Sequence, residues 1–210
     1  MSTTVRRSFR SCLNAQFLKI ADHTPRALLV CVVLVGAVLS SNAQAPLDPL
    51  PAIRELYLKS AEEETLVEEG IERTAALIEQ SNPTDPTLEA YHAGFLIMRA
   101  KHTFWPKKKL RYLREGLPIL DEIVKVNREH IEARYLRLLS CYYLPNFLGR
   151  KWSVREDFKI LGELLPKHAG DYPPRLYADM VSFLLKEGSP GPELRSRLKQ
   201  TLGTVLPATR

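Results

Sequence analysis

The sequence lacks the short motifs that mark common catalytic and metal sites. Its 210 residues contain no HExxH or CxxC ligand pattern, no G-x-S-x-G nucleophile motif, no P-loop and no G-x-G-x-x-G loop. Sustained alternation of apolar and polar residues is also missing, which argues against β-strands. We therefore expect a helical protein that is not an enzyme and that binds no cofactor.

Cysteine and histidine are too sparse for a disulfide framework or a metal site. Of the 3 cysteines, Cys12 and Cys31 lie in an N-terminal segment that we expect to be removed. Cys141 is then unpaired, and we interpret it as a small buried residue on a helix. His92 and His102 are about 15 Å apart along one predicted helix and cannot share an ion, so no metal is expected.

The N-terminus has the three parts of a secretory signal. Basic residues precede an apolar run over residues 27–39, and small or polar residues follow it. Cleavage fits after Ala43 or after Ala45, and we favour Ala43 because the second cut places Pro46 directly after it. Gln44 is then the first residue of a protein exported to the periplasm or outer envelope. A retained anchor is the alternative, but the run is shorter than the roughly 20 residues of a spanning helix.

The remaining chain has the apolar period of helices. Residues 1–43 are the predicted signal peptide, residues 44–51 a proline-rich extended linker, and residues 52–210 a helical-repeat domain. Eight short helices joined by short turns predict an all-α fold of about four antiparallel helix pairs. The triplets that start at Leu88 and Ile131 resemble each other, which indicates a tetratricopeptide-like, α-solenoid array.

Several helix boundaries can be placed from local signals. Asp85 followed by Pro86 predicts the start of the third helix. Pro118 predicts a kink or break in the fourth helix. Two capping boxes predict the starts of the second and sixth helices, and they consist of Thr65 with Glu68 and Ser153 with Glu156.

Between about residues 85 and 160 the sequence resembles a group of uncharacterised exported helical proteins of bacteroidete-type bacteria. The segments that carry the resemblance are Ala90-Tyr91, Arg99-Ala100-Lys101, residues 106–110, residues 131–138, residues 145–149 and Glu156-Asp157. Pro118 and the pair Arg150-Lys151 depart from the pattern of this group. The resemblance implies helix pairs and export, and it implies no activity.

Charge is distributed unevenly along the chain. The formal net charge is +6, but the signal holds five basic residues and one acid, so the mature chain is close to +2 and no nucleic-acid partner is expected. Residues 53–80 hold eight glutamates, whereas seven basic residues lie between residues 99 and 114. This basic run either docks on the acidic helices or stays solvated, or it forms an anion-binding or membrane-surface patch beside Phe104 and Trp105.

A second basic pair lies on the fifth predicted helix. Arg134 and Arg137 flank its apolar stripe, and antiparallel pairing brings them near Asp157. We interpret them first as a structural network that fixes the loop over residues 146–149, with a ligand-binding arginine pair as the alternative.

The leading functional hypothesis is a non-enzymatic scaffold for a protein or peptide partner in the cell envelope. The alternatives are a small envelope enzyme or ligand-binding protein, with a pocket lined by Arg134, Arg137 and Asn146, and a peripheral membrane contact through Lys107–Lys109. The candidate binding residues under these hypotheses are Lys101, Lys107, Lys108, Lys109, Arg111, Arg134, Arg137 and Asn146.

Overall fold

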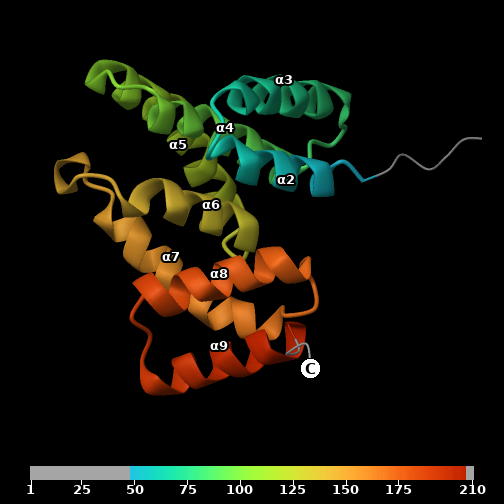
Figure 1. Cartoon of the computed structure of the whole chain (residues 1–210), viewed down its shortest axis with the longest axis vertical. Helices are drawn as coiled ribbons and strands as arrows, with labels where there is room; N and C mark the ends of the chain where they lie inside the picture. Colours follow the sequence, from blue (N-terminus) through green and yellow to red (C-terminus); the bar gives the residue numbers. More distant parts are fainter. Residues whose placement is uncertain (1–47, 207–210) are drawn as a thin grey trace, which may run out of the picture. The chain divides into compact units, whose positions relative to one another are not determined.

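The computed structural model describes residues 48–206, which are all-helical (Figure 1). Within that range there are eight α-helices and two short 3-10 helices and no β-strand. The α-helices are α2 (Leu50–Ser60), α3 (Thr65–Gln80), α4 (Pro86–His102), α5 (Pro106–Val126), α6 (Ile131–Tyr142), α7 (Lys151–Leu164), α8 (Pro174–Glu187) and α9 (Pro192–Val205). The predicted all-α fold is confirmed, and the predicted signal with its cleavage site lies outside the described residues.

Successive helices pack as antiparallel pairs, α2 with α3, α4 with α5, α6 with α7 and α8 with α9. Helix α4 also packs against α2 and α6, so it lies at the centre of the first three pairs. Ala90 and Ala93 on α4 are fully buried, and their small side chains permit this close approach. None of the described helices is long and apolar enough to cross a membrane.

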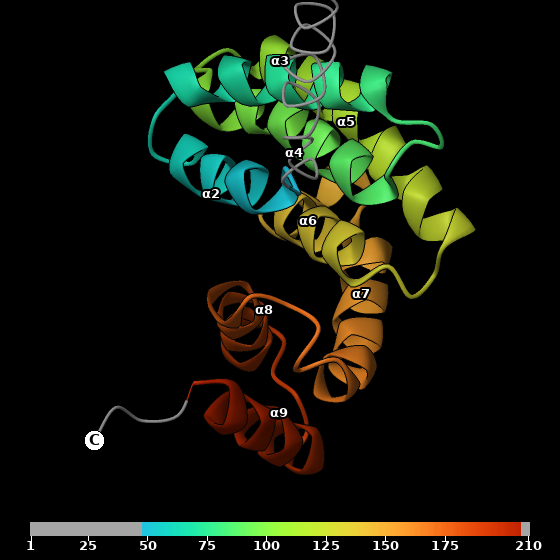
Figure 2. The same cartoon turned by 90° about the vertical axis from the view of Figure 1, so that its right-hand side faces the viewer.

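Helix α6 connects two apolar cores. One of its faces, which includes Leu136 and Cys141, packs into a core formed mainly by α2, α4 and α5. Another face, which includes Tyr135 and Leu138, packs into a core shared with α7, α8 and α9. Figure 2 shows α6 between helices α2 to α5 and helices α8 and α9. Because α6 is buried on two sides, the polar groups that it carries must find partners inside the protein.

Local signals placed some helix starts correctly and others wrongly. Asp85 is the N-cap of α4, where its side chain accepts a 2.7 Å hydrogen bond from the Thr87 backbone N–H. Helix α2 starts at Leu50, so the predicted linker over residues 44–51 is wrong for its last two residues.

Both predicted capping boxes are wrong. Thr65 is the first residue of α3, and its hydroxyl donates to the Glu63 carboxylate. Ser153 lies within the first turn of α7, is fully buried, and donates to the Arg150 carbonyl oxygen at 2.8 Å. A capping hydroxyl must stand on an extended residue outside the helix, and both of these residues are already helical.

Of the kink or break predicted at Pro118, the break is wrong, because α5 runs unbroken from Pro106 to Val126. A proline inside a helix removes one backbone hydrogen bond, to the carbonyl four residues earlier. Here that carbonyl belongs to Arg114, and both Arg114 and Pro118 are exposed. Water can therefore satisfy the carbonyl, and the helix continues.

Candidate functional site

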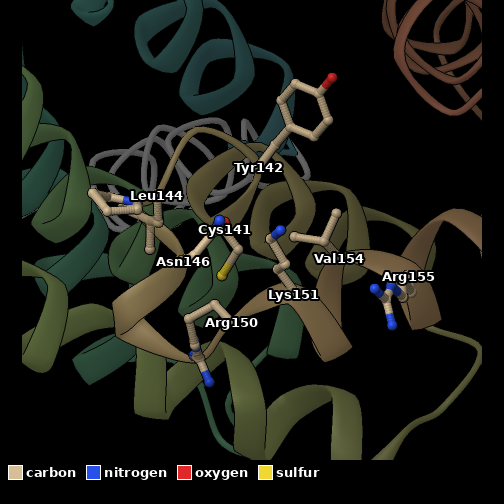
Figure 3. A pocket seen from close by; sticks show the side chains of 9 residues that line it. Cys141, Tyr142, Leu144, Asn146, Arg150, Lys151, Val154 and Arg155 are labelled. Carbon is tan, nitrogen blue, oxygen red and sulfur yellow. The ribbon is translucent and has the colours of Figure 1, made fainter.

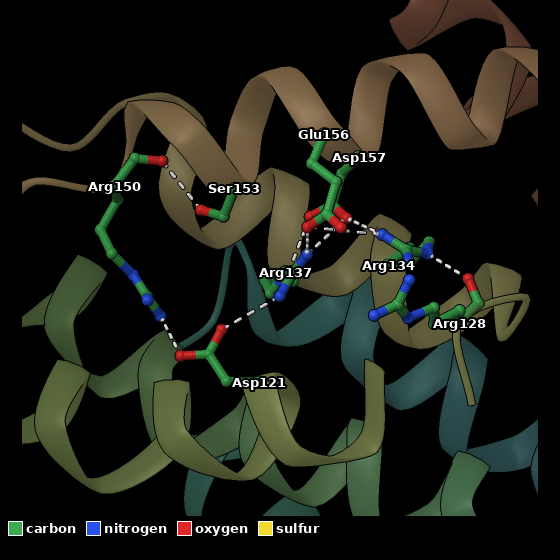
Figure 4. A network of polar contacts seen from close by, with 8 residues as sticks. All are labelled: Asp121, Arg128, Arg134, Arg137, Arg150, Ser153, Glu156 and Asp157. Atoms are coloured by element: carbon green, nitrogen blue, oxygen red, sulfur yellow. Dashed lines mark hydrogen bonds and ion pairs between the residues drawn. The ribbon is translucent and has the colours of Figure 1, made fainter. Parts of the chain in front are cut away.

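The predicted arginine pair meets a buried carboxylate between α6 and α7 (Figure 4). Arg134 donates from Nη1 to Asp157 Oδ1 at 2.7 Å. Arg137 binds the same carboxylate with two donors, each 2.8 Å from an oxygen. Asp157 and Arg134 are fully buried, and Arg137 is nearly so. The predicted approach of both arginines to Asp157 is confirmed.

This network extends to α5 through Asp121. Arg137 Nη1 lies 3.2 Å from Asp121 Oδ1, and Arg150 Nη2 lies 2.8 Å from Asp121 Oδ2. Arg150 is the residue directly before α7, so the network holds the end of the α6–α7 connection against α5. Its geometry therefore fits the structural role, because neither Arg134 nor Arg137 has a donor that reaches the protein surface.

The electrostatics of the network reflect its burial. Burial raises the pKa of Asp157, and the guanidinium groups of Arg137 and Arg134 oppose that shift. Arg134 also donates from Nε to the Arg128 carbonyl, whereas its Nη2 atom has no partner among the described residues. Arg134 and Arg137 are two buried cations beside the one fully buried anion, Asp157, so the stability of the cluster depends on the Asp157 carboxylate.

A second polar cluster joins three helices that are far apart in sequence. Glu132 on α6 is 4 % exposed, and it accepts a 3.0 Å hydrogen bond from Arg54 Nε on α2. It also accepts a 2.7 Å hydrogen bond from the Tyr91 hydroxyl on α4. Burial, followed by the Glu132 charge, raises the pKa of Tyr91 well above its ordinary value.

A cavity of about 290 Å³ opens beside the α6–α7 connection (Figure 3). Three of its side chains are cationic, Arg150, Lys151 and Arg155, and no acidic residue lines it. The nine lining residues are Cys141, Tyr142, Leu144, Pro145, Asn146, Arg150, Lys151, Val154 and Arg155. Asn146 lines the cavity as the pocket hypothesis predicts, but Arg134 and Arg137 do not. They are committed to Asp157, so that part of the hypothesis is wrong.

Part of the basic run does contact the acidic first helix pair. Arg99 on α4 forms an ion pair with Glu68 on α3. Lys101 donates to the Ala61 carbonyl oxygen in the α2–α3 turn. The hydrogen bond from the Arg99 guanidinium lowers the pKa of Glu68; burial opposes this shift, and the Arg99 charge adds a smaller contribution to it.

The rest of the basic run lies on the surface. Arg111 pairs with Glu115 one turn away at 3.5 Å and lies 5.0 Å from the Tyr112 ring centre. Lys107, Lys108 and Lys109 are exposed in the first turn of α5, and they form no ion pair with any residue in the described range. The structure therefore divides the run into cations with partners and a lysine triplet without them.

Exposed aromatic side chains accompany these turns. Phe104 and Trp105, which precede the lysine triplet, are 86 % and 63 % exposed. Tyr143, Phe147 and Trp152 lie in and beside the α6–α7 connection and are also exposed. Sequence reasoning identified the first pair and missed Phe147 and Trp152. The signal that could have found them is an aromatic residue inside a loop next to Arg150 and Lys151.

The remaining reactive groups have ordinary structural partners. Cys141 is 2 % exposed, and burial raises the pKa of its thiol. His92 Nδ1 lies 2.9 Å from the Thr74 hydroxyl, and His102 Nε2 lies 2.7 Å from the Ser60 carbonyl oxygen. Within residues 48–206, no group of three or more metal-binding side chains converges.

Comparison of the chain with protein-family models, with curated proteins and with solved structures gave no match. Its function is therefore inferred from its own residues and their contacts.

Proposed function

We propose that residues 50–205 form a tetratricopeptide-like helical-repeat array that acts, without catalysis, as a scaffold for a protein or peptide partner in the cell envelope. The observation that carries this proposal is the order in which the helices pack. The first helices of three successive pairs, α2, α4 and α6, contact one another in sequence, and α3 and α5 each pack on the first helix of the next pair. This order of contacts is typical of α-solenoids.

The Glu132 cluster supports the same arrangement. Its three members, Arg54, Tyr91 and Glu132, come from the first helices of the first, second and third pairs. One carboxylate therefore fixes the register of three successive repeats. Export through the predicted signal, and kinship with exported helical proteins, belong to the same proposal.

The partner is expected on the exposed face of α2 that carries Glu55 and Leu58. Glu55 on α2 has its pKa lowered by Lys59 and, to a smaller extent, by the charge of Arg175 at the start of α8. Leu58 lies one turn further along α2 and is 41 % exposed. An exposed leucine between charged residues suits a peptide with apolar and charged side chains.

Site-specific photocrosslinking in the exporting cell tests this proposal. A crosslinker that replaces Leu58 should capture one envelope protein, whereas the same group at the exposed position Gln200 on α9 should capture none. The charge reversal Arg175→Glu should then reduce the yield from position 58. A yield at position 58 no greater than that at position 200 overturns the proposal.

The cationic cavity favours a second candidate function, which is the binding of a small anion. Arg150 and Lys151 lie at the start of α7, and the first turn of this helix contains no acidic residue. The N-terminus of a helix favours a bound anion. Titration calorimetry with inorganic phosphate tests this candidate. Heat that disappears in Lys151→Glu supports it, and no heat with the unchanged protein removes it.

A further inference from the structure

Two turns of the protein concentrate its exposed aromatic rings. All five exposed aromatic side chains of residues 48–206 lie in or beside the α4–α5 and α6–α7 connections, and they are Phe104, Trp105, Tyr143, Phe147 and Trp152. From these side chains, and from the charges beside them, we propose that the two connections dock the protein onto an anionic lipid surface. This inference does not depend on the scaffold proposal, because it uses the turns and not the face of α2 that carries Leu58.

Folding does not explain why Phe104 and Trp105 are aromatic. Their rings pack edge to face on each other, with centres 6.2 Å apart, and most of each side chain stays in water. Apolar surface left in water contributes no burial free energy to the fold. At the headgroup level of a bilayer, by contrast, tryptophan and other aromatic rings are favoured.

Folding also does not explain the position of the lysine triplet. Lys107, Lys108 and Lys109 occupy the first turn of α5. That turn contains no acidic residue, and no side chain caps the start of the helix. Cations at a helix N-terminus are unfavourable, because the helix dipole is positive there. A polybasic cluster beside aromatic rings is instead the chemistry that binds anionic lipid headgroups.

The two connections lie on the same side of the helical stack. Helices α4 and α6 pack against each other as successive first helices, and each is followed by the turn to its own second helix. Figure 1 shows both turns on the left, the green one near residue 104 and the gold one near residue 146. The second turn adds Lys151 and Arg155, both exposed, to the charge of the first.

The composition of this surface favours lipid over a protein partner. Protein interfaces are depleted of lysine at their cores, and their strongest aromatic contacts fill pockets shielded from water. Here Phe104 and Trp105 are followed by three exposed lysines, and Trp152 directly follows the exposed Lys151. One acidic element lies nearby, the α2–α3 turn with Glu62, Glu63 and Glu64, which approaches Lys101. It should weaken binding, so Glu→Gln changes at residues 62–64 should strengthen it.

Tryptophan fluorescence provides a direct test, because the only 2 tryptophans of the chain, Trp105 and Trp152, lie on the proposed surface. The full-length protein is mixed with phosphatidylglycerol vesicles at low salt and, separately, with phosphatidylcholine vesicles. We expect a blue shift of the emission with the anionic vesicles, and reversal by salt. Trp152→Phe should keep a blue shift from Trp105, and Trp105→Phe should keep one from Trp152. A shift in only one of the two variants would contradict docking through both connections.

A charge-matched pair of variants isolates the surface. Each lysine near an anionic surface contributes about fivefold in affinity, so K107E/K108E/K109E should weaken vesicle binding by at least about 100-fold. The control K125E/K159E/K199E reverses three exposed lysines away from both turns and should bind much more tightly than the first variant. Residues 1–47 are identical in both variants, so any membrane affinity of that segment cancels in the comparison.

Three results would overturn the inference. The first is no blue shift with phosphatidylglycerol vesicles at low salt. The second is equal binding to phosphatidylcholine vesicles, which would remove the role of charge. The third is equal loss of binding in the two triple variants, which would show that net charge matters and the location of the lysines does not.

Discussion

The interior of the α6–α7 pair and the turn between α4 and α5 are both rich in basic residues, and they use those residues in opposite ways. Inside α6–α7, Arg134 and Arg137 are almost completely buried and share the carboxylate of Asp157. At the α4–α5 turn, Lys107 and Lys108 are exposed and have no ion pair with any residue that the structure describes.

The difference separates structural charge from charge that is available for binding. A buried arginine must be paired, because an unpaired charge in the interior costs several kcal/mol. An exposed lysine does not need an ion pair for stability, so its position can be used for binding. Arg137 is thus explained by the fold, whereas the lysine triplet is not.

Removing the carboxylate of the buried network should have the largest effect on stability. Asp157→Ala removes the fully buried counterion that Arg134 and Arg137 share and leaves them beside only the partly exposed Glu156 and Asp121. We expect the free energy of unfolding to fall by about 3–5 kcal/mol. Urea denaturation measures this change. Glu156→Ala is the matched control, since Glu156 contacts Arg137 at 2.9 Å but is 41 % exposed, and its loss should cost less than about 1 kcal/mol. Equal losses in the two variants would contradict the structural role of burial here.

Charge reversal of the lysine triplet should raise the stability of the fold instead of lowering it. K107E/K108E/K109E places acids in the first turn of α5, where the helix dipole favours them, so stability should rise by about 1–2 kcal/mol. The thermal midpoint by circular dichroism measures it, at low ionic strength. A fall in the midpoint would show that the lysines stabilise the fold, and the comparison with the buried network would then fail.

A third prediction concerns pH and the start of α6. His130 is the N-cap of α6, where its Nδ1 accepts a 3.3 Å hydrogen bond from the Ala133 N–H. Burial lowers the pKa of His130, an effect that the charges of Glu132 and Asp85 oppose. The folded state therefore binds the proton less readily than the unfolded state, and stability is lost as the pH falls below the ordinary value of about 6.5.

The size of the pH effect should be about 1 kcal/mol, because protonation also removes the cap acceptor. His130→Asn keeps a capping oxygen and cannot titrate, so its denaturation midpoint should change less between pH 7.5 and 5.5 than that of the unchanged protein. Parallel pH profiles would contradict this assignment. At pH 7.5 the two proteins should differ by less than about 0.5 kcal/mol, which checks that asparagine caps the helix.

The sequence predicted those parts of the fold that depend on short-range chemistry. Helix number and the Asp85 N-cap follow from apolar period and local hydrogen bonding, and the structure confirms both. The contact of Arg134 and Arg137 with Asp157 followed from the pairing of two helices close in sequence. These features need no knowledge of distant segments.

Features that depend on contacts between segments far apart in the sequence were missed. In the Glu132 cluster, Arg54 contacts Glu132, which is 78 positions away, and no local sequence pattern predicts that contact. The prediction of a pocket lined by Arg134 and Arg137 is wrong because both side chains are buried and bind Asp157. The cavity lies instead beside Arg150, which the sequence marked only as a departure from a pattern.

The smallest expected effect is also the sharpest test of the aromatic turn. If Phe104 and Trp105 serve a surface outside the protein, replacing both with alanine should change the free energy of unfolding by less than about 0.5 kcal/mol. Phe95→Ala is the matched control, because that ring is 0 % exposed and its truncation should cost about 3–5 kcal/mol. Urea denaturation of the two variants gives both values. A double alanine variant that loses as much stability as Phe95→Ala would assign these rings to the fold, whereas unchanged stability with lost vesicle binding would assign them to the interface.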